Sequence, residues 1–282
     1  MQGKTVVVTG GTSGIGEIAA LRLAEKGARI VLIARDKTRA DATLAKLKNA
    51  NPSATHTAHY GDLSALAEMK RVAGEVAASE TRIDVLVNNA GAVFLSRKTS
   101  VDGLEMTFAT NHMAYFVVTN ILLDRLKATP GARIVSTASD AHKSGKLDFD
   151  DLQSEKSYRS FRVYGTSKLC NILFTRELAR RLDDVDVTAN CLHPGFVATR
   201  FGQNNATNIF AKLLRGGVMS LGISPEEGAK TIIHLASSPD VAAISGEYFY
   251  KCKVAEPTAA AQNDADAKRL WDVSAKLAGL VL

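Results

Sequence analysis

The sequence has little cysteine. Its 282 residues include only Cys170, Cys191 and Cys252, which lie far apart and form no CxxC pair. This spacing argues against a disulfide framework and a cysteine metal site, and it favours buried thiols in a reducing compartment. No His, Cys, Asp and Glu cluster has the spacing of metal ligands, so we expect no metal site.

Long hydrophobic runs are also missing, although 46% of the residues are hydrophobic. No apolar stretch reaches the ~20 residues that are needed to cross a bilayer. The first residues, MQGKTVVVTGG, enter a strand pattern directly and leave no room for a secretion signal. We therefore expect a cytoplasmic protein without membrane insertion.

The chain lacks linkers, repeats of solenoid length and low-complexity tracts, so we expect one domain over residues 1–282. Its net charge is +6, but basic and acidic residues are mixed along predicted helices, for example at 178–186. Such mixing is typical of a solvated helix face rather than of a nucleic-acid footprint. Nucleic acid is therefore not an expected partner.

What the first half does contain is a regular alternation of short β-branched runs and longer amphipathic segments. Helices are expected at about 64–79 and 103–127, among others. Apolar strands separated by helices predict a parallel sheet covered on both faces, which is the doubly wound, Rossmann-like α/β class. Ligands of such sheets lie beyond the carboxyl ends of the strands. The expected strands are KTVVVTG, ARIVLIAR, ATHTAHY, IDVLVNN and ARIVSTAS.

The second half departs from this alternation. A polar, irregular stretch at 140–160 precedes an expected helix at about 164–182, the strand VDVTANCLHPG and a last strand, EYFYKC. We expect a small substrate lid at approximately 200–224, whose apolar residues could line a pocket or serve ordinary packing. The amphipathic tail at approximately 257–282 is expected to be helical, and the sequence leaves open whether it covers the site or a partner subunit.

The turn after the first strand reads TGGTSGIG, which places Gly10, Gly14 and Gly16 before an Ala- and Leu-rich helix. Glycines permit a tight turn and let a pyrophosphate approach the amides at the helix N-terminus. The spacing is not the usual GxGxxG, and a glycine-rich turn can also be a simple tight connection. The strand before it and the helix after it favour a nucleotide site.

The end of the second strand bears on the choice of nucleotide. An NAD site generally has a carboxylate there for the ribose 2′-hydroxyl, whereas a 2′-phosphate requires an arginine. Here Ala34 stands at the position of the carboxylate and Arg35 follows it. The sequence therefore favours NADP(H) over NAD(H). The adjacent Asp36 weakens this inference, although we interpret it as a cap of the next helix.

Tyr164 and Lys168 are a candidate catalytic pair. Tyr164 is the only one of six tyrosines with a lysine four residues later, which puts the two side chains on one helical face. A phenol with a pKa of ~10 is a poor base at neutral pH, but a nearby ammonium group stabilises the phenolate and lowers that pKa. Taken alone, the pattern also arises by chance on surface helices.

Tyr164 and Lys168 occur together with several other motifs in a fixed order along the chain, and this order makes the pair a more specific signal. With these motifs the chain resembles the short-chain dehydrogenase/reductase family. Within that family it is similar to the retinol dehydrogenase-like and WW-domain oxidoreductase-like branch. The residues that carry the resemblance are TGGTSGIG (9–16), NNAG (88–91), Asn111, Ser139 in IVSTAS, YGTSK (164–168) and HPGFVAT (193–199).

The resemblance implies a catalytic tetrad of Asn111, Ser139, Tyr164 and Lys168. Ser139 would hydrogen-bond the substrate oxygen, and Tyr164 would donate or accept the proton. Lys168 would bind the nicotinamide ribose and lower the pKa of Tyr164, and Asn111 would hold a water that links Lys168 to solvent. The cofactor carries the hydride. His142 and His193 lie near this site, and we interpret them as structural because a tyrosine relay is already present.

The resemblance also implies a set of cofactor contacts at the ends of the strands. Asp62 would contact the adenine and Gly195 and Thr199 the nicotinamide carboxamide, whereas helix caps and strand-end turns are the alternative interpretations. Tyr164 and Lys168 belong to the set as well. The remaining expected contacts are Gly10, Thr12, Ser13, Gly14, Ile15, Gly16, Arg35, Leu63, Asn88, Ala90, Gly91, Pro194 and Val197.

The function that the resemblance implies is hydride transfer between NADP(H) and a small-molecule carbonyl or alcohol, expected to be an apolar aldehyde, ketone or alcohol. The alternative is a catalytically idle NADP(H)-binding regulator, which the complete tetrad disfavours. An epimerase or dehydratase is disfavoured by the glycine spacing. The family resemblance further implies a homodimer or homotetramer packed through the helices that begin near Gly103 and Tyr164.

Overall fold

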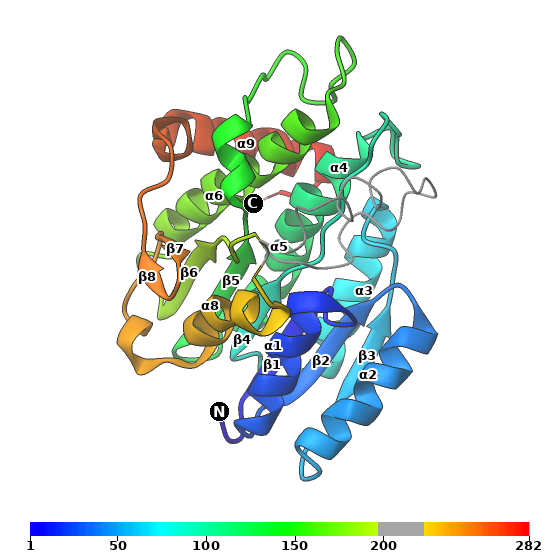
Figure 1. Cartoon of the computed structure of the whole chain (residues 1–282), viewed down its shortest axis with the longest axis vertical. Helices are drawn as coiled ribbons and strands as arrows, with labels where there is room; N and C mark the ends of the chain where they lie inside the picture. The colour runs from blue at the N-terminus through cyan, green and yellow to red at the C-terminus, as the bar shows by residue number, and fades with distance from the viewer. Residues whose placement is uncertain (197–222, 282) are drawn as a thin grey trace.

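A computed structural model of the protein describes residues 1–196 and 223–281. Within these residues eight strands form one sheet in the order β3-β2-β1-β4-β5-β6-β7-β8 (Figure 1). This arrangement confirms the predicted doubly wound α/β class. The strands are β1 (Thr5–Thr9), β2 (Arg29–Ala34), β3 (Thr57–Tyr60), β4 (Val85–Asn88), β5 (Ala132–Thr137), β6 (Val187–Leu192), β7 (Tyr248–Tyr250) and β8 (Lys253–Val254).

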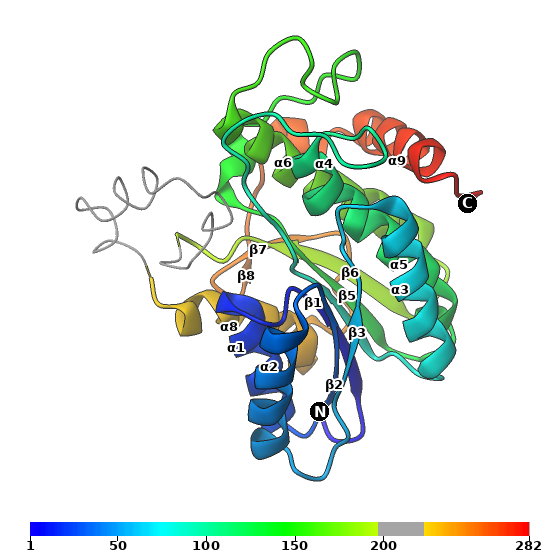
Figure 2. The same cartoon turned by 90° about the vertical axis from the view of Figure 1, so that its right-hand side faces the viewer.

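Helices cover both faces of the sheet, as Figures 1 and 2 show. Side chains of α1, α2 and α8 pack on one face, and those of α3, α5, α6 and α9 on the other. The main helices are α1 (Gly14–Glu25), α2 (Lys37–Ala50), α3 (Leu66–Ser79), α4 (Met106–Phe108), α5 (Ala114–Lys127), α6 (Ser160–Arg181), α8 (Pro225–Ser237) and α9 (Asp264–Ala278).

The strands are apolar because both of their faces are buried. Successive side chains of a strand point to opposite faces. Val6 and Val8 accordingly join the core under α1, whereas Val7 between them joins the core on the other side. All strand pairs from β3 to β7 are parallel, so their carboxyl ends meet at one edge. That edge carries the residues of the expected site.

The prediction of a single last strand over EYFYKC was wrong. β7 ends at Tyr250 because Lys251 and Cys252 take left-handed φ values of 48° and 61°. A two-residue turn with positive φ at both positions is the geometry of a tight hairpin. The chain therefore reverses into β8, which pairs antiparallel with β7 and forms the edge of the sheet.

The helix that the sequence predicts at 103–127 starts later and is interrupted. The first turn, α4, begins at Met106 after Glu105, whose side chain accepts hydrogen bonds from the amides of Thr107 and Phe108. A π-helix, η1 (Ala109–Met113), then separates α4 from α5. Single π-turns inside helices frequently occur at functional sites, and this one contains Asn111.

The C-terminal tail is helical, as expected. α9 begins after Asn263, whose side chain accepts a hydrogen bond from the amide of Asp266, and it ends before Gly279 with a φ of +59°. Its buried face repeats at helical spacing and lies along α6 (Figures 1 and 2). Most of the expected lid, by contrast, lies outside the described residues. None of the helices in the described ranges is both long and apolar enough to span a bilayer.

Candidate functional site

Tyr164 and Ser139 face each other at the carboxyl end of β5. Ser139 follows β5 directly and caps the 3-10 helix η2 (Asp140–Ser144), while Tyr164 lies in the second turn of α6. Tyr164 is a partly exposed residue, yet its hydroxyl is enclosed by protein and hydrogen-bonds with the Ser139 side chain. Burial raises the pKa of Tyr164 to about 12, and the bond to Ser139 opposes this rise.

Lys168 is the buried cation of the site. Its side chain is 2% exposed, and its Nζ donates a hydrogen bond of 2.9 Å to the carbonyl oxygen of Thr137. The ammonium lies 5.7 Å from the centre of the Tyr164 ring. Burial lowers the pKa of Lys168 to about 7, and no carboxylate of the described residues forms an ion pair with it.

The prediction that Lys168 lowers the pKa of Tyr164 stays a prediction, because burial and Ser139 are the two influences on that pKa in this geometry. The ammonium is directed at the Thr137 carbonyl, and its own pKa of about 7 leaves it only partly charged at neutral pH. Burial is the dominant influence on the Tyr164 hydroxyl, and the group that lowers its pKa is Ser139. At neutral pH the tyrosine is consequently a proton donor.

Asn111 is fully buried, and its amide is held on both sides. The Oδ1 atom accepts a hydrogen bond of 2.8 Å from the amide of Ala92, and the Nδ2 atom donates to the Ala92 carbonyl at 3.0 Å. Nδ2 also contacts the Ser167 hydroxyl at 3.0 Å. Asn111 thus connects the segment after β4 to α6, one residue before Lys168.

The glycine turn after β1 is tightly packed against the end of β4. Gly10 has a φ of +66°, and a Cβ atom there would lie 2.7 Å from the Cα of Ala90. A Cβ on Gly16 would lie 2.4 Å from the Gly10 carbonyl oxygen. Ser13 precedes α1 without a side-chain hydrogen bond to the first turn, so the amides there are available to an anion.

The side chains of the two asparagines in NNAG point in opposite directions, and the expected contact of Asn88 with the cofactor stays a prediction. Asn88 is fully buried, and its Nδ2 donates to the Thr119 hydroxyl at 2.9 Å, so its side chain faces the core. Asn89, which we did not select, is partly exposed and donates from Nδ2 to the Gly10 carbonyl at 3.1 Å. The period-two alternation of side chains along β4 is the signal that could have distinguished the two.

The expected adenine end contains Arg35, Asp36 and Asp62. Arg35 is exposed after β2, and Asp36 caps α2 by accepting a hydrogen bond of 2.9 Å from the amide of Arg39, as predicted. Asp62 accepts from the amide and the hydroxyl of Ser64 at 3.1 and 2.9 Å. It therefore forms a local turn before α3 and leaves one of its carboxylate oxygens for a ligand.

His193 holds the turn that follows β6. Its Nδ1 accepts a hydrogen bond of 3.2 Å from the amide of Gly195, which has a φ of +86°. The ring stacks on Tyr250 at 4.0 Å and on Tyr248 at 5.6 Å between ring centres. Burial lowers the pKa of His193 to about 4, so the ring is neutral at physiological pH. Val197 and Thr199, also expected in this segment, lie outside the described residues.

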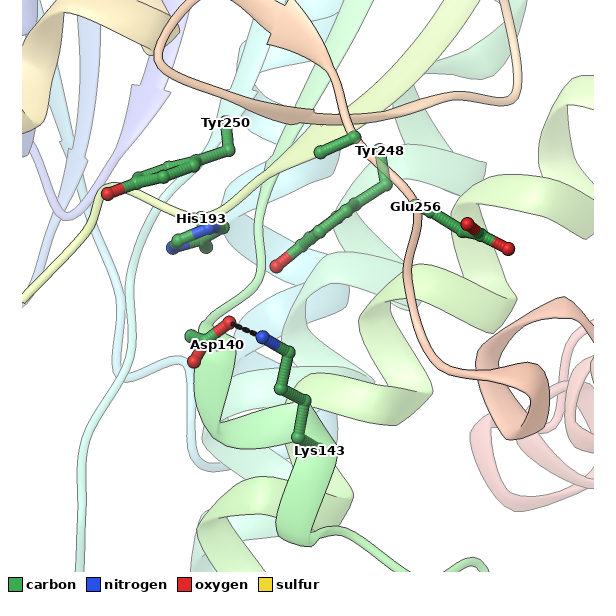
Figure 3. Close-up of a pocket in the computed structure, with 7 residues that line it drawn as sticks. Asp140, Lys143, His193, Tyr248, Tyr250 and Glu256 are labelled. Carbon is green, nitrogen blue, oxygen red and sulfur yellow. Dashed lines mark ion pairs between the residues drawn. The ribbon is translucent and has the colours of Figure 1, made fainter.

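A cavity of about 310 Å³ lies against this aromatic stack, as Figure 3 shows. Asp140 and Lys143 form an ion pair of 2.7 Å on its opposite wall. The neighbouring His142 donates from Nδ1 to the Ser139 carbonyl at 2.8 Å and accepts at Nε2 from the amide of Thr258 at 3.3 Å. Both of its nitrogens serve the backbone, which confirms the structural interpretation. Over residues 1–196 and 223–281, no three His, Cys, Asp or Glu side chains form a metal-binding group.

A sequence model of the family described as short chain dehydrogenase matches residues 4–209. Among curated proteins, retinol dehydrogenase 14 of Mus musculus is 40% identical, in an alignment that covers 100% of this chain and 87% of that protein. Retinol dehydrogenase 13 of Homo sapiens is 39% identical over 99% of this chain and 85% of its own length.

Solved structures share the arrangement of the sheet and the helices. An uncharacterized protein from Mycobacterium paratuberculosis has a TM-score of 0.78 and 28% identity, covering 99% of this chain and 94% of its own. A short chain dehydrogenase from Burkholderia cenocepacia in complex with NADP has a TM-score of 0.70 and 26% identity, covering 88% of this chain and 96% of its own.

Proposed function

Because this chain belongs to the short-chain dehydrogenase family and is retinol dehydrogenase-like, we propose that it is an NADP(H)-dependent oxidoreductase of apolar aldehydes, ketones or alcohols. The observation that carries the proposal is the enclosed Tyr164 hydroxyl, hydrogen-bonded with Ser139 and placed beside the buried Lys168. A proton donor that is fixed against a second hydroxyl can bind and protonate a carbonyl oxygen.

The residues at the carboxyl edge fit a nicotinamide dinucleotide. Gly91 has no side chain, and a Cβ atom there would extend to 3.2 Å from Asn111 Oδ1 and 3.6 Å from Lys168 Nζ. The backbone at Gly91 therefore passes close to both groups, and a side chain there would press on Asn111. The glycine turn and the uncapped start of α1 fit a pyrophosphate at the other end.

Within this proposal, the residues of the chain have separate tasks. Ser139 holds the substrate oxygen, and Tyr164 donates its proton to that oxygen during reduction. Lys168 binds the ribose hydroxyls and, when protonated, stabilises the phenolate that forms, while Asn111 anchors the connection to Ala92 and holds the relay water. A bound nicotinamide supplies the hydride in reduction and accepts it in oxidation. The high pKa of Tyr164 suits the reductive direction.

The test is a screen for NADPH oxidation with aldehydes, ketones, quinones and steroids. We expect the highest kcat/KM with apolar aldehydes or ketones, and the reverse reaction with NADP⁺ and the corresponding alcohol. Tight NADPH binding without turnover of any class would favour the idle regulatory protein instead. Conversion of a substrate without net cofactor oxidation would indicate an epimerase or dehydratase.

Our proposal of NADP(H) over NAD(H) predicts a large effect at Arg35. A guanidinium group that pairs with a 2′-phosphate contributes about 1.5–3 kcal/mol. We therefore expect Arg35→Ala to weaken NADPH binding about 10- to 100-fold and to leave NADH binding nearly unchanged, as measured by fluorescence titration. The Asp36 carboxylate accepts a hydrogen bond from the amide of Arg39, and this bond weakens its electrostatic repulsion of a 2′-phosphate.

The control for Arg35→Ala is Lys48→Ala, which removes the same charge from the other end of α2. It should change the affinity for neither nucleotide. Tighter binding of NADH than of NADPH by the unchanged protein would contradict the cofactor preference. So would an Arg35→Ala variant with full NADPH affinity. The homodimer or homotetramer and the cytoplasmic location stay predictions.

A further inference from the structure

The residue after Asn111 connects the π-helix to the C-terminal helix. His112 is fully buried, and its Nε2 lies 2.8 Å from the hydroxyl of Ser274 in α9. These two residues are 162 positions apart in the sequence. A π-helix is less regular than an α-helix and depends on its surroundings, so a contact within it can determine how its side chains point.

The opposite side of the His112 ring faces α6. The Asn171 side chain lies beside the ring and opposes the fall in the His112 pKa that burial causes. Among the described atoms, neither His112 Nδ1 nor Asn171 Oδ1 has a hydrogen-bond partner. Asn171 in turn donates from Nδ2 to the Thr137 carbonyl at 3.4 Å, the oxygen that also accepts the hydrogen bond from Lys168. Polar side chains thus lie one beside the next from α9 to the site, with hydrogen bonds at both ends of the series and none between His112 and Asn171.

Aromatic packing holds α9 against this region. Trp271 stacks on Phe174 of α6 at 5.8 Å and meets Phe116 of α5 edge-on at 5.0 Å between ring centres. The His112 ring lies 6.2 and 6.3 Å from the same two phenylalanines. The register of α9, and with it the place of the Ser274 hydroxyl, is therefore fixed by side chains of α5 and α6.

The segment before α9 is connected to the site through a second histidine. His142 donates from Nδ1 to the Ser139 carbonyl and accepts at Nε2 from the amide of Thr258. His112 and His142 are both buried, and burial lowers the pKa of each, so both rings are neutral and can donate at one nitrogen and accept at the other. The C-terminal segment thus bonds the residue that follows Asn111 and the histidine that bonds the Ser139 carbonyl.

We propose that residues 255–278 are a positioning element of the catalytic centre, and that Ser274 and His112 are its positioning residues. Ser274 orients the His112 ring, and the ring fixes the π-turn that presents Asn111. The same ring packs beside Asn171 of α6, whose amide donates to the Thr137 carbonyl. Neither residue touches the reacting atoms. The link to turnover rests on the proposed oxidoreductase function, whereas the link to the order of the π-turn does not.

The experiment compares Ser274→Ala, which removes only the hydroxyl, with His112→Phe, which keeps an aromatic ring in the cluster. Each variant should lower kcat about 3- to 10-fold and leave the KM for carbonyl and NADPH within about twofold, because binding groups stay in place while Asn111 shifts. The double variant should lose no more than the larger single loss, since both changes break one contact.

Hydrogen exchange measured by mass spectrometry gives a readout that does not need activity. The amide of Ala92, which Asn111 Oδ1 holds at 2.8 Å, and the amides of residues 109–113 should exchange several-fold faster in Ser274→Ala. The control is Lys268→Ala, which breaks an exposed ion pair with Asp272 on the same helix. It should affect exchange in α9 only and leave kcat unchanged.

Unchanged exchange at Ala92 and 109–113 in Ser274→Ala would overturn the proposal, and so would an equal loss of kcat in Lys268→Ala. Losses of kcat that multiply in the double variant would show that the contact between Ser274 and His112 is not the route. Faster exchange in a protein that reduces no carbonyl would confirm the positioning of the π-turn and contradict the proposed function instead.

Discussion

Replacing Tyr164 by phenylalanine should lower kcat about 10³-fold while leaving NADPH affinity within about twofold. The substitution removes the one hydroxyl that can give its proton to the carbonyl oxygen, and general acid catalysis contributes about 10²- to 10⁴-fold. The bond with Ser139 is lost as well, so the substrate oxygen keeps one donor instead of two. Steady-state turnover with the best substrate of the screen, together with fluorescence titration of NADPH, measures both effects.

The matched control is Tyr158→Phe, which removes a hydroxyl that donates to the Phe94 carbonyl at 2.8 Å in the segment before α6. It should cost about 1 kcal/mol of stability and little turnover. Because the pKa of Tyr164 is raised to about 12, the tyrosine stays protonated between pH 6 and 8, so a fall in carbonyl reduction within this range should follow the Lys168 ammonium, whose pKa is about 7. A Tyr164→Phe variant with unchanged turnover would show that another group donates the proton.

The sequence predicted the sheet because its signal is physical and local. Strands buried on both faces must be apolar, and the turns between them must be glycine-rich or polar, so β1, β2, β4 and β5 are recognisable without a structure. The resemblance located Ser139, Tyr164 and Lys168, and the parallel sheet brings them to one edge. Asp36 was predicted as a cap from its position alone, and the structure confirms it.

Other features depend on contacts that no local pattern encodes. The opposite directions of the Asn88 and Asn89 side chains depend on where β4 ends relative to the core, and both residues are asparagines. The π-turn at Asn111 and the hairpin turn at Lys251 occur in segments whose composition suits an ordinary helix and strand. The direction of the Lys168 ammonium is set by the Thr137 carbonyl, which belongs to a distant strand.

Replacing Lys168 by methionine should abolish most turnover and at the same time stabilise the fold. The ammonium is enclosed without a carboxylate partner, so folding costs free energy as long as the group is charged. Its pKa falls from about 10.4 in the unfolded chain to about 7 in the folded protein, a difference that corresponds to roughly 5 kcal/mol. The lost hydrogen bond to Thr137 offsets about 1 kcal/mol of this.

The sign of the effect depends on pH. Below pH 7 the folded and unfolded chains both carry the charge, and the full cost of burying it applies. Between pH 7 and about 10.4 the unfolded chain binds more protons, so this lysine makes the unchanged protein more stable as the pH rises. The advantage of Lys168→Met should therefore be about 2 kcal/mol or more at pH 6 and should shrink toward pH 10.

Guanidinium unfolding of the nucleotide-free protein at pH 6, 8 and 9.5 measures this trend. Lys127→Met, which replaces an exposed lysine at the end of α5, should show neither the gain nor its pH dependence. Turnover of Lys168→Met should fall at least about 100-fold, because the ribose contact and the charge beside the phenolate are both removed. If Lys168→Met were less stable than the unchanged protein at pH 6, the buried ammonium would be better compensated than its surroundings indicate, and its burial would not cost the stability that we expect.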